Sequence, residues 1–145
     1  MAVVSIPDPR WVDALSDVPG VELVEWDMKS PPPRSDIEVV VPPYMSSPKR
    51  LEHLAALPDL EAVQLVTAGY DHALPYLPDG VRLANGAGIH DTSTAELALA
   101  LVLASQRGIP DFARAQERGE WLRAAGRPSL ADRRVLVVGY GSVGL

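Results

Sequence analysis

Short runs of apolar residues alternate with helix-like segments along most of this chain, and this alternation limits the folds open to it. Runs with the length and composition of β-strands occupy residues 3–6, 21–26, 37–41, 61–67 and 81–85. Helices are expected at 9–15 and from Pro48, which follows the capping residue Ser47. Strands that alternate with helices form a parallel sheet with helices on both faces. We therefore predict an α/β fold with a flavodoxin-like parallel sheet.

The helix expected from Ser47 should bury one face against that sheet. Leu51, Leu54 and Ala55 have the i, i+3, i+4 spacing of an inward face on an α-helix. Pro58 ends this helix, because a proline in a helix interior removes a hydrogen bond and clashes with the preceding turn.

Residues 91–108 predict a longer helix of unusual composition. Asp91 or Ser93 can cap its N-terminus, Ser93 and Glu96 have the spacing of a capping box, and Gly108 ends it. Nearly every residue from 95 to 104 is apolar, whereas a helix at a protein surface shows a polar face. A membrane span needs about 20 apolar residues in a row, so this run is too short to be one. We expect a helix covered on all sides, wedged between two bodies of protein.

The segment 135–145 begins like a dinucleotide-binding unit. The apolar run 135–138 predicts a buried central strand, and Gly139, Gly141 and Gly144 follow it with the spacing G-x-G-x-x-G. In such a motif the glycines permit a tight turn, close approach to a pyrophosphate and close packing of a helix. A glycine-rich C-terminal tail is the alternative. The acidic residue that would separate NAD from NADP is expected about 20 positions later, beyond Leu145.

The stretch VTAGYDHAL (66–74) follows the fourth predicted strand directly. In open parallel sheets, ligands bind outside the carboxyl ends of the strands. Gly69 would let the backbone turn at that edge and present N–H groups, which form a cradle for a carboxylate. An ordinary strand-to-helix turn capped by Asp71 is the alternative.

A second loop of this kind, NGAGIHDTSTAE (85–96), follows the fifth predicted strand. Thr92, Ser93 and Thr94 either meet a ligand there or only cap the following helix. His90 is a candidate catalytic residue, although a lone histidine near a helix start is more often structural. The three histidines of the chain are scattered without the spacing of metal ligands, so we predict no metal site.

Composition argues against several classes of function. A net charge of −6 disfavours nucleic-acid binding, because a phosphate backbone requires a basic face. The absence of cysteine excludes disulfides and thiolate chemistry and suits a reducing compartment. The N-terminus lacks a basic region, and Pro7 interrupts its apolar stretch, so it is a poor signal peptide. We expect a cytoplasmic protein with neither nucleic acid nor membrane as a partner.

Taken in order, three stretches resemble the NAD(P)-dependent D-isomer-specific 2-hydroxyacid dehydrogenases, which include the glyoxylate/hydroxypyruvate reductases. AGYDH (68–72) is similar to the G-x-D turn of that family. NGAGIHDTSTAELALALVLASQR (85–107) is similar to its loop and Ala-Glu helix, and VLVVGYGSVGL (135–145) to its cofactor strand. The resemblance runs from about residue 60 to residue 145, and the preceding residues match only in pattern.

The resemblance implies a division of the chain and a place for the substrate. It implies a substrate-binding domain over 1–91, an interdomain bridging helix over 92–108, an arm and linker over 109–134, and the start of a dinucleotide-binding domain over 135–145. Backbone groups of Ala68, Gly69 and Tyr70 would hold the substrate carboxylate. The family is also expected to form homodimers.

By the same resemblance, the cofactor is NAD or NADP. Thr94 would approach the cofactor side of the cleft, and the N–H groups of Ser142 and Val143 would bind the pyrophosphate together with Gly139, Gly141 and Gly144. The implied reaction is hydride transfer between the nicotinamide ring and C2 of a small 2-keto or 2-hydroxy acid.

None of the family's catalytic residues matches a residue of this chain. The catalytic arginine, glutamate and histidine of the family lie downstream of the glycine motif, so Arg107, Arg123 and His90 take none of their roles. We therefore expect the N-terminal part of a longer oxidoreductase, inactive by itself. The alternative is a stand-alone, non-catalytic flavodoxin-like module that binds a small carboxylate or a protein partner.

Overall fold

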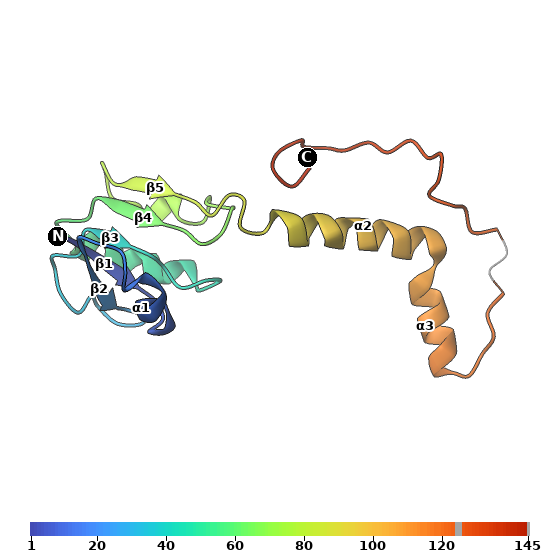
Figure 1. Cartoon of the computed structure of the whole chain (residues 1–145), viewed down its shortest axis with the longest axis horizontal. Coiled ribbons are helices and arrows are strands. Elements are labelled where there is room, and N and C mark those ends of the chain that lie inside the picture. The colour runs from blue at the N-terminus through green and yellow to red at the C-terminus, as the bar shows by residue number, and fades with distance from the viewer. Residues whose placement is uncertain (124–125, 145) are drawn as a thin grey trace. The chain divides into compact units, whose positions relative to one another are not determined.

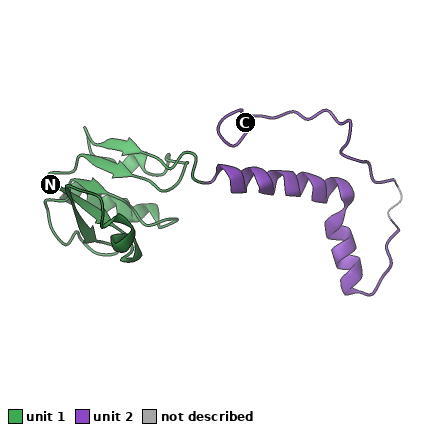
Figure 2. Cartoon of the chain, viewed as in Figure 1, with its two compact units in different colours: residues 1–89 green, residues 90–145 purple. Residues whose placement is uncertain are grey.

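The structure is a computed structural model that describes residues 1–123 and 126–144 (Figure 1). It contains two compact units, Met1–Ile89 and His90–Leu145 (Figure 2). Strands occupy the first unit and two α-helices the second. Part of the predicted linker, residues 124–125, and the last residue of the predicted cofactor segment, Leu145, lie outside the described residues.

The first unit is built on a five-stranded sheet in which every paired strand is parallel. Its strands are β1 (Ala2–Ile6), β2 (Val21–Glu25), β3 (Val39–Val40), β4 (Ala62–Gln64) and β5 (Arg82–Ala84). Their order in the sheet, β2-β1-β3-β4-β5, is the flavodoxin-like order. The predicted fold is therefore confirmed. Pro42 follows β3 closely, and proline ends a central strand because it has no N–H to donate.

The core of the first unit lies on one face of this sheet. Val3, Val40 and Val63 belong to a buried cluster with residues from the helical connections. The next element, η1 (Pro48–Ala56), is a 3-10 helix rather than the α-helix expected from the sequence. A 3-10 helix has three residues per turn, so side chains three apart lie on one face. Leu51 and Leu54 are buried accordingly.

The 3-10 geometry corrects the inward face predicted for this segment. Leu57 continues the buried row at a spacing of three, whereas Ala55 is exposed. Ser47 is the N-cap residue but makes no capping hydrogen bond with its side chain. Packing on the sheet, rather than the hydroxyl of Ser47, therefore determines how this helix lies.

The opposite face of the sheet is covered more thinly. Val4, Leu23 and Val39 share that face through their strand pairing and are half-buried, whereas Ile6, two residues after Val4, is fully buried. The connection from β1 to β2 runs in one direction along the sheet, and the connection from β3 to β4 runs in the opposite direction. Since both connections are right-handed, α1 (Arg10–Leu15) lies on this face and η1 on the other. No residue of α1 is buried, so one short helix provides little cover.

The second unit begins with α2 (Asp91–Arg107) and α3 (Ile109–Glu117), joined at Gly108. Gly108 has φ 64°, a left-handed conformation that ends α2 where the sequence predicts. The predicted caps are not formed: His90 is the N-cap residue, and the hydroxyl of Ser93 donates to the carbonyl of His90 at 3.1 Å. The hydroxyl therefore tightens the first turn instead of forming a capping box with Glu96.

The apolar residues of α2 are exposed, contrary to the expectation of a helix covered on all sides. No residue of α2 is buried, and Leu97, Leu99 and Leu101 are 59%, 63% and 61% exposed. Within the described part of the second unit, α3 is the other helix available to pack against α2. None of the helices in the described residues has the length and apolar composition needed to cross a membrane.

The strand predicted at residues 135–138 is also absent. This stretch has no regular secondary structure, and Leu136 and Val138 are 86% and 90% exposed. A strand in a parallel sheet needs neighbours to satisfy its N–H and C=O groups, and the described residues of the second unit contain no strand. In this chain the apolar pattern of a central strand is present without its pairing partners, so the stretch faces solvent.

Candidate functional site

The turn that follows β4 has its carbonyl groups occupied. The backbone N–H of Gly86 donates to the carbonyl of Thr67 at 2.8 Å. The side-chain amide of Asn85 donates to the carbonyl of Ala68 at 2.8 Å. The hydroxyl of Thr67 reaches forward and donates to the carbonyl of Gly69 at 2.9 Å. The turn is thus held by the loop after β5, its neighbour in the sheet, as well as by its own side chain.

The N–H groups of the same turn remain available. The carbonyl of Tyr70 also accepts a bond, from the N–H of Ala73 at 2.9 Å. By contrast, the N–H groups of Ala68, Gly69 and Tyr70 donate to no group in residues 1–123 and 126–144, and all three residues are exposed. Consecutive free N–H groups at a sheet edge give a local positive potential that suits an anion. The turn can therefore accept a carboxylate.

Gly69 and Gly86 serve this turn in different ways. Gly69 does not have a left-handed φ, and a Cβ placed on it would meet nothing within 4 Å. The expectation that Gly69 is needed for the turn conformation is therefore wrong; its missing side chain instead leaves open space beside the free N–H groups. A Cβ on Gly86 would lie 2.9 Å from the carbonyl carbon of Val66 and 3.1 Å from the nitrogen of Thr67. Only glycine at 86 allows the two loops to lie this close.

Sequence reasoning missed the residues that hold the turn in shape. Thr67, Asn85 and Gly86 act through hydrogen bonds or close approach to the backbone of the turn. The available signal was that polar and glycine residues follow two strands directly, since parallel strands end at the same edge of a sheet.

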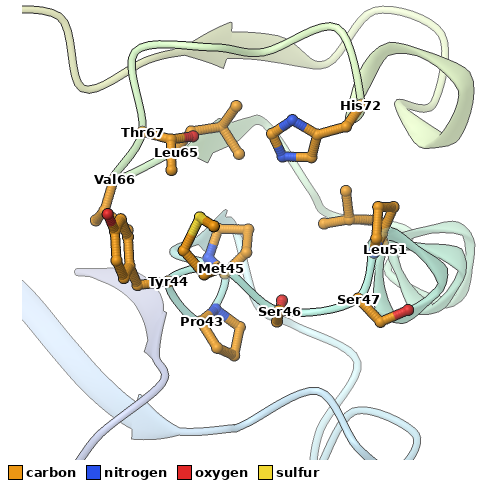
Figure 3. A pocket seen from close by; sticks show the side chains of 12 residues that line it. Pro43, Tyr44, Met45, Ser46, Ser47, Leu51, Leu65, Val66, Thr67 and His72 are labelled. Carbon is orange, nitrogen blue, oxygen red and sulfur yellow. The ribbon is translucent and has the colours of Figure 1, made fainter. Parts of the chain in front are cut away.

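A cavity of about 170 Å³ adjoins the turn (Figure 3). It lies between the loop after β3, the start of η1 and the segment after β4. Its lining residues are Pro42, Pro43, Tyr44, Met45, Ser46, Ser47, Pro48, Leu51, Leu65, Val66, Thr67 and His72. In Figure 3 the imidazole of His72 points toward the middle of the cavity, with Leu51 beside it. This wall is mainly apolar, with a few polar groups.

The glycine motif of the second unit, Gly139 to Gly144, forms a tight turn. Gly139 has φ 91°, and the N–H of Gly144 donates to the carbonyl of Gly141 at 3.0 Å. A Cβ on Gly144 would lie 2.6 Å from the carbonyl oxygen of Gly139, so this position requires glycine. Ser142 and Val143 form the exposed tip of the loop. The tight turn therefore forms even though the strand before it does not.

A further candidate, Thr94, lies at the start of the second unit. Thr94 is exposed in the first turn of α2, where its N–H donates to the carbonyl of His90 at 3.0 Å. No set of three or more histidine, aspartate or glutamate side chains among the described residues is placed to hold a metal ion. The first unit thus joins Ala68, Gly69 and Tyr70 to the loop after β5, while Thr94 and the glycine motif belong to the second unit.

The first unit is thus an α/β fold with a flavodoxin-like sheet and, at the carboxyl edge of that sheet, a turn whose N–H groups suit an anion. Comparison with solved structures narrows the class of protein that this chain resembles. The chain aligns over 99% of its length with a D-isomer-specific 2-hydroxyacid dehydrogenase family protein from Aeromonas salmonicida, at TM-score 0.78 and 21% identity. It aligns equally far with an NADPH-dependent glyoxylate/hydroxypyruvate reductase from Sinorhizobium meliloti, at TM-score 0.74 and 26% identity, and that protein was crystallised with NADP and sulfate.

A D-isomer-specific 2-hydroxyacid dehydrogenase from Xanthobacter autotrophicus, crystallised with NADPH, matches at TM-score 0.71 and 25% identity. No protein-family model matches the sequence, and a comparison with curated proteins finds no match. The solved structures confirm the resemblance predicted from the three motifs. The chain spans 47% of the first two chains and 48% of the third, about half of their length.

Proposed function

We propose that this chain is the N-terminal half of an NAD(P)-dependent oxidoreductase that moves a hydride between the nicotinamide ring and C2 of a small 2-keto or 2-hydroxy acid. The observation that carries the proposal is the turn after β4. Its four carbonyls, from Thr67 to Tyr70, accept hydrogen bonds, and its three consecutive N–H groups from Ala68 to Tyr70 donate to no group in the described part of the chain. A carboxylate is the part of such a substrate that these donors would bind.

The cofactor in this proposal is NAD or NADP. The Sinorhizobium structure contains NADP and the Xanthobacter structure contains NADPH. The loop from Gly139 to Gly144 would bind the pyrophosphate; its G-x-G-x-x-G spacing and the turn closed by the hydrogen bond from Gly144 to Gly141 support this role. Ser142 and Val143 would donate N–H groups, and Thr94 would lie on the cofactor side. The bound nicotinamide would supply or accept the hydride.

The proposal extends to the organisation of the protein. Residues 1–91 would form the substrate-binding domain, 92–108 the bridging helix, 109–134 an arm and linker, and 135–145 the start of the cofactor domain. The apolar side chains exposed on α2 favour the proposal that another part of the protein covers this helix, since contiguous exposed apolar surface marks an interaction site. We also propose a cytoplasmic homodimer that takes a small 2-keto or 2-hydroxy acid.

The test is a steady-state assay of this chain alone and of the protein with its cofactor-binding half, using NADH or NADPH with glyoxylate, hydroxypyruvate or pyruvate. The longer protein should turn over one of these acids, and the 145-residue chain should not. Turnover by the chain alone would contradict the proposal. A longer protein without turnover that still binds a carboxylate would favour the non-catalytic module.

Gly69→Val provides the sharper test of the turn. The added side chain enters open space, so the fold should tolerate it, but it would crowd the free N–H groups. In the longer protein we expect the KM for the keto acid to rise at least about tenfold, which corresponds to about 1.4 kcal/mol, while cofactor affinity stays the same. An unchanged KM in a well-folded variant would exclude the turn from the substrate site.

A further inference from the structure

The cavity of Figure 3 adjoins the start of the turn that carries the proposed function. Val66 and Thr67 line the cavity, and Ala68 follows them directly in the chain. The hydroxyl of Thr67, itself part of the lining, donates to the carbonyl of Gly69. A ligand whose carboxylate binds the turn therefore has the cavity next to it for its remaining atoms.

The size of the cavity limits those remaining atoms to a small group. A volume of about 170 Å³ is close to the roughly 150 Å³ cavity that holds benzene in another protein. A substituent of a few non-hydrogen atoms would fill this volume. The site is thus suited to short 2-keto and 2-hydroxy acids.

The chemistry of the wall selects among short acids. Most of the lining is apolar, including Met45, Leu51 and Leu65. His72 is different, because its imidazole points into the cavity and makes no hydrogen bond within residues 1–123 and 126–144. An imidazole nitrogen can donate to or accept from a hydroxyl group. The wall also carries the hydroxyl groups of Tyr44, Ser46, Ser47 and Thr67. These polar groups suit a ligand with a polar group of its own, and the imidazole of His72 points toward the middle of the cavity, where that group would lie.

We propose that His72 is a specificity-determining residue that hydrogen-bonds a hydroxyl group on C3 of the substrate. This inference rests on the proposed function, since it takes the turn to hold the substrate carboxylate. The site would then prefer 2-keto and 2-hydroxy acids with a hydroxyl on C3 over those that end in a methyl group. A site that hydrogen-bonds a substrate hydroxyl disfavours the analogue without it, because the polar group of the protein is then left unpaired.

D-Glycerate and D-lactate are suitable probes, because they differ only in the hydroxyl on C3. Titration of each into the ¹⁵N-labelled chain, followed by amide chemical shifts, reports on the turn and the cavity separately. Both acids should shift the amides of Ala68, Gly69 and Tyr70. Glycerate should bind about fivefold more tightly, the effect of one net hydrogen bond, and it alone should shift the ring signals of His72.

Substitutions at His72 separate specificity from support of the fold. His72→Leu should remove the preference for glycerate while leaving lactate binding unchanged, and His72→Gln, which keeps a donor and an acceptor, should restore part of it. His53→Gln is the matched control, because His53 lies on η1 outside the lining of the cavity and should leave the preference intact. Because His72 is exposed, its replacement should leave the protein folded, and the dispersion of the amide spectrum should be unchanged.

Each alternative result is informative. Equal affinity for the two acids, with shifts at the turn, would overturn the role of His72 and leave the proposed function standing. A His72→Leu variant that weakens both acids equally would also overturn it, by showing a structural role. Absence of shifts at Ala68, Gly69 and Tyr70 with either acid would overturn the carboxylate turn, and the inference about His72 with it.

Discussion

Asp8 and Arg10 form a tight ion pair just beyond the carboxyl end of β1. The guanidinium of Arg10 and its backbone N–H both donate to the carboxylate of Asp8. The side-chain hydrogen bond, followed by the backbone one, lowers the pKa of Asp8 to about 2. A carboxyl group with a lowered pKa in the folded state stabilises the fold above its unfolded pKa, and this contribution is lost as the pH falls through about 2. Because the pair is exposed, the contribution is small.

Carboxyl carbon NMR should detect the pair directly. We expect Asp8 to titrate with a midpoint near 2 and the midpoint to rise toward 3.8 in Arg10→Gln. Lys29→Gln is the matched control, because Lys29 pairs with Asp27 and should leave Asp8 unchanged. A midpoint near 3.8 in the unsubstituted protein would show that the pair does not persist in solution.

At the scale of elements, the junction between α2 and α3 depends on Gly108. Arg127 donates to the carboxylate of Asp111 at 2.6 Å, and its guanidinium lies 5.3 Å from the ring centre of Phe112. A Cβ on Gly108 would overlap this guanidinium. The junction thus combines a left-handed residue with a side chain that closes over it.

Gly108→Ala should destabilise α3 more than Gly119→Ala. Gly108 has φ 64° and Gly119 has φ 67°, so each substitution costs about 1 kcal/mol of backbone strain. Only Gly108→Ala also displaces Arg127, since a Cβ on Gly119 meets nothing within 4 Å. Amide hydrogen exchange across Ile109–Glu117 measures the difference. In an Arg127→Ala background the two substitutions should become equal; equal effects without that change would contradict the argument.

Residues 135–138 provide a second prediction for an element. Their amides should exchange rapidly in the 145-residue chain, because the stretch is exposed and unpaired. In the protein with its cofactor-binding half, the same amides should be protected as in a central strand. Val63 and Gln64 in β4 are the internal reference, since they pair with β5 in this chain and should stay paired in the longer protein. Equal protection of 135–138 and β4 in the chain alone would show that the strand has found a partner.

For the whole molecule, the burial pattern predicts where stability resides. Leu54 is 1% exposed in the core of the first unit, and Leu97 is 59% exposed on α2. Leu54→Ala should cost about 2–5 kcal/mol, the range for large-to-small changes in a core. Leu97→Ala should change the free energy of unfolding by no more than about 0.5 kcal/mol.

Urea unfolding followed by tryptophan fluorescence measures both substitutions. Trp26 is 4% exposed and reports on the core, provided that Trp11 and Trp121 are replaced by phenylalanine. If the two leucine variants lose similar amounts of unfolding free energy, the side chain of Leu97 is covered in solution and the prediction is wrong.

The sequence by itself determined the five strands, the end of α2 at Gly108 and the tight turn at Gly139. Each depends on local properties: short runs of apolar residues, a left-handed glycine, or glycine spacing. The three motifs also determined the resemblance to the dehydrogenases, and with it the candidate turn at Ala68, Gly69 and Tyr70.

Only the tertiary structure decided the features that depend on residues far apart in the chain. The sequence of η1 also suits an α-helix, but the segment is a 3-10 helix whose buried row, Leu51, Leu54 and Leu57, belongs to the core while Ala55 is exposed. Asn85 and Gly86 hold the turn after β4 from a neighbouring strand, a contact that no local pattern encodes. Residues 135–138 have a complete strand pattern and form no strand, because hydrogen bonds in a parallel sheet come from other strands and none lies in the described second unit.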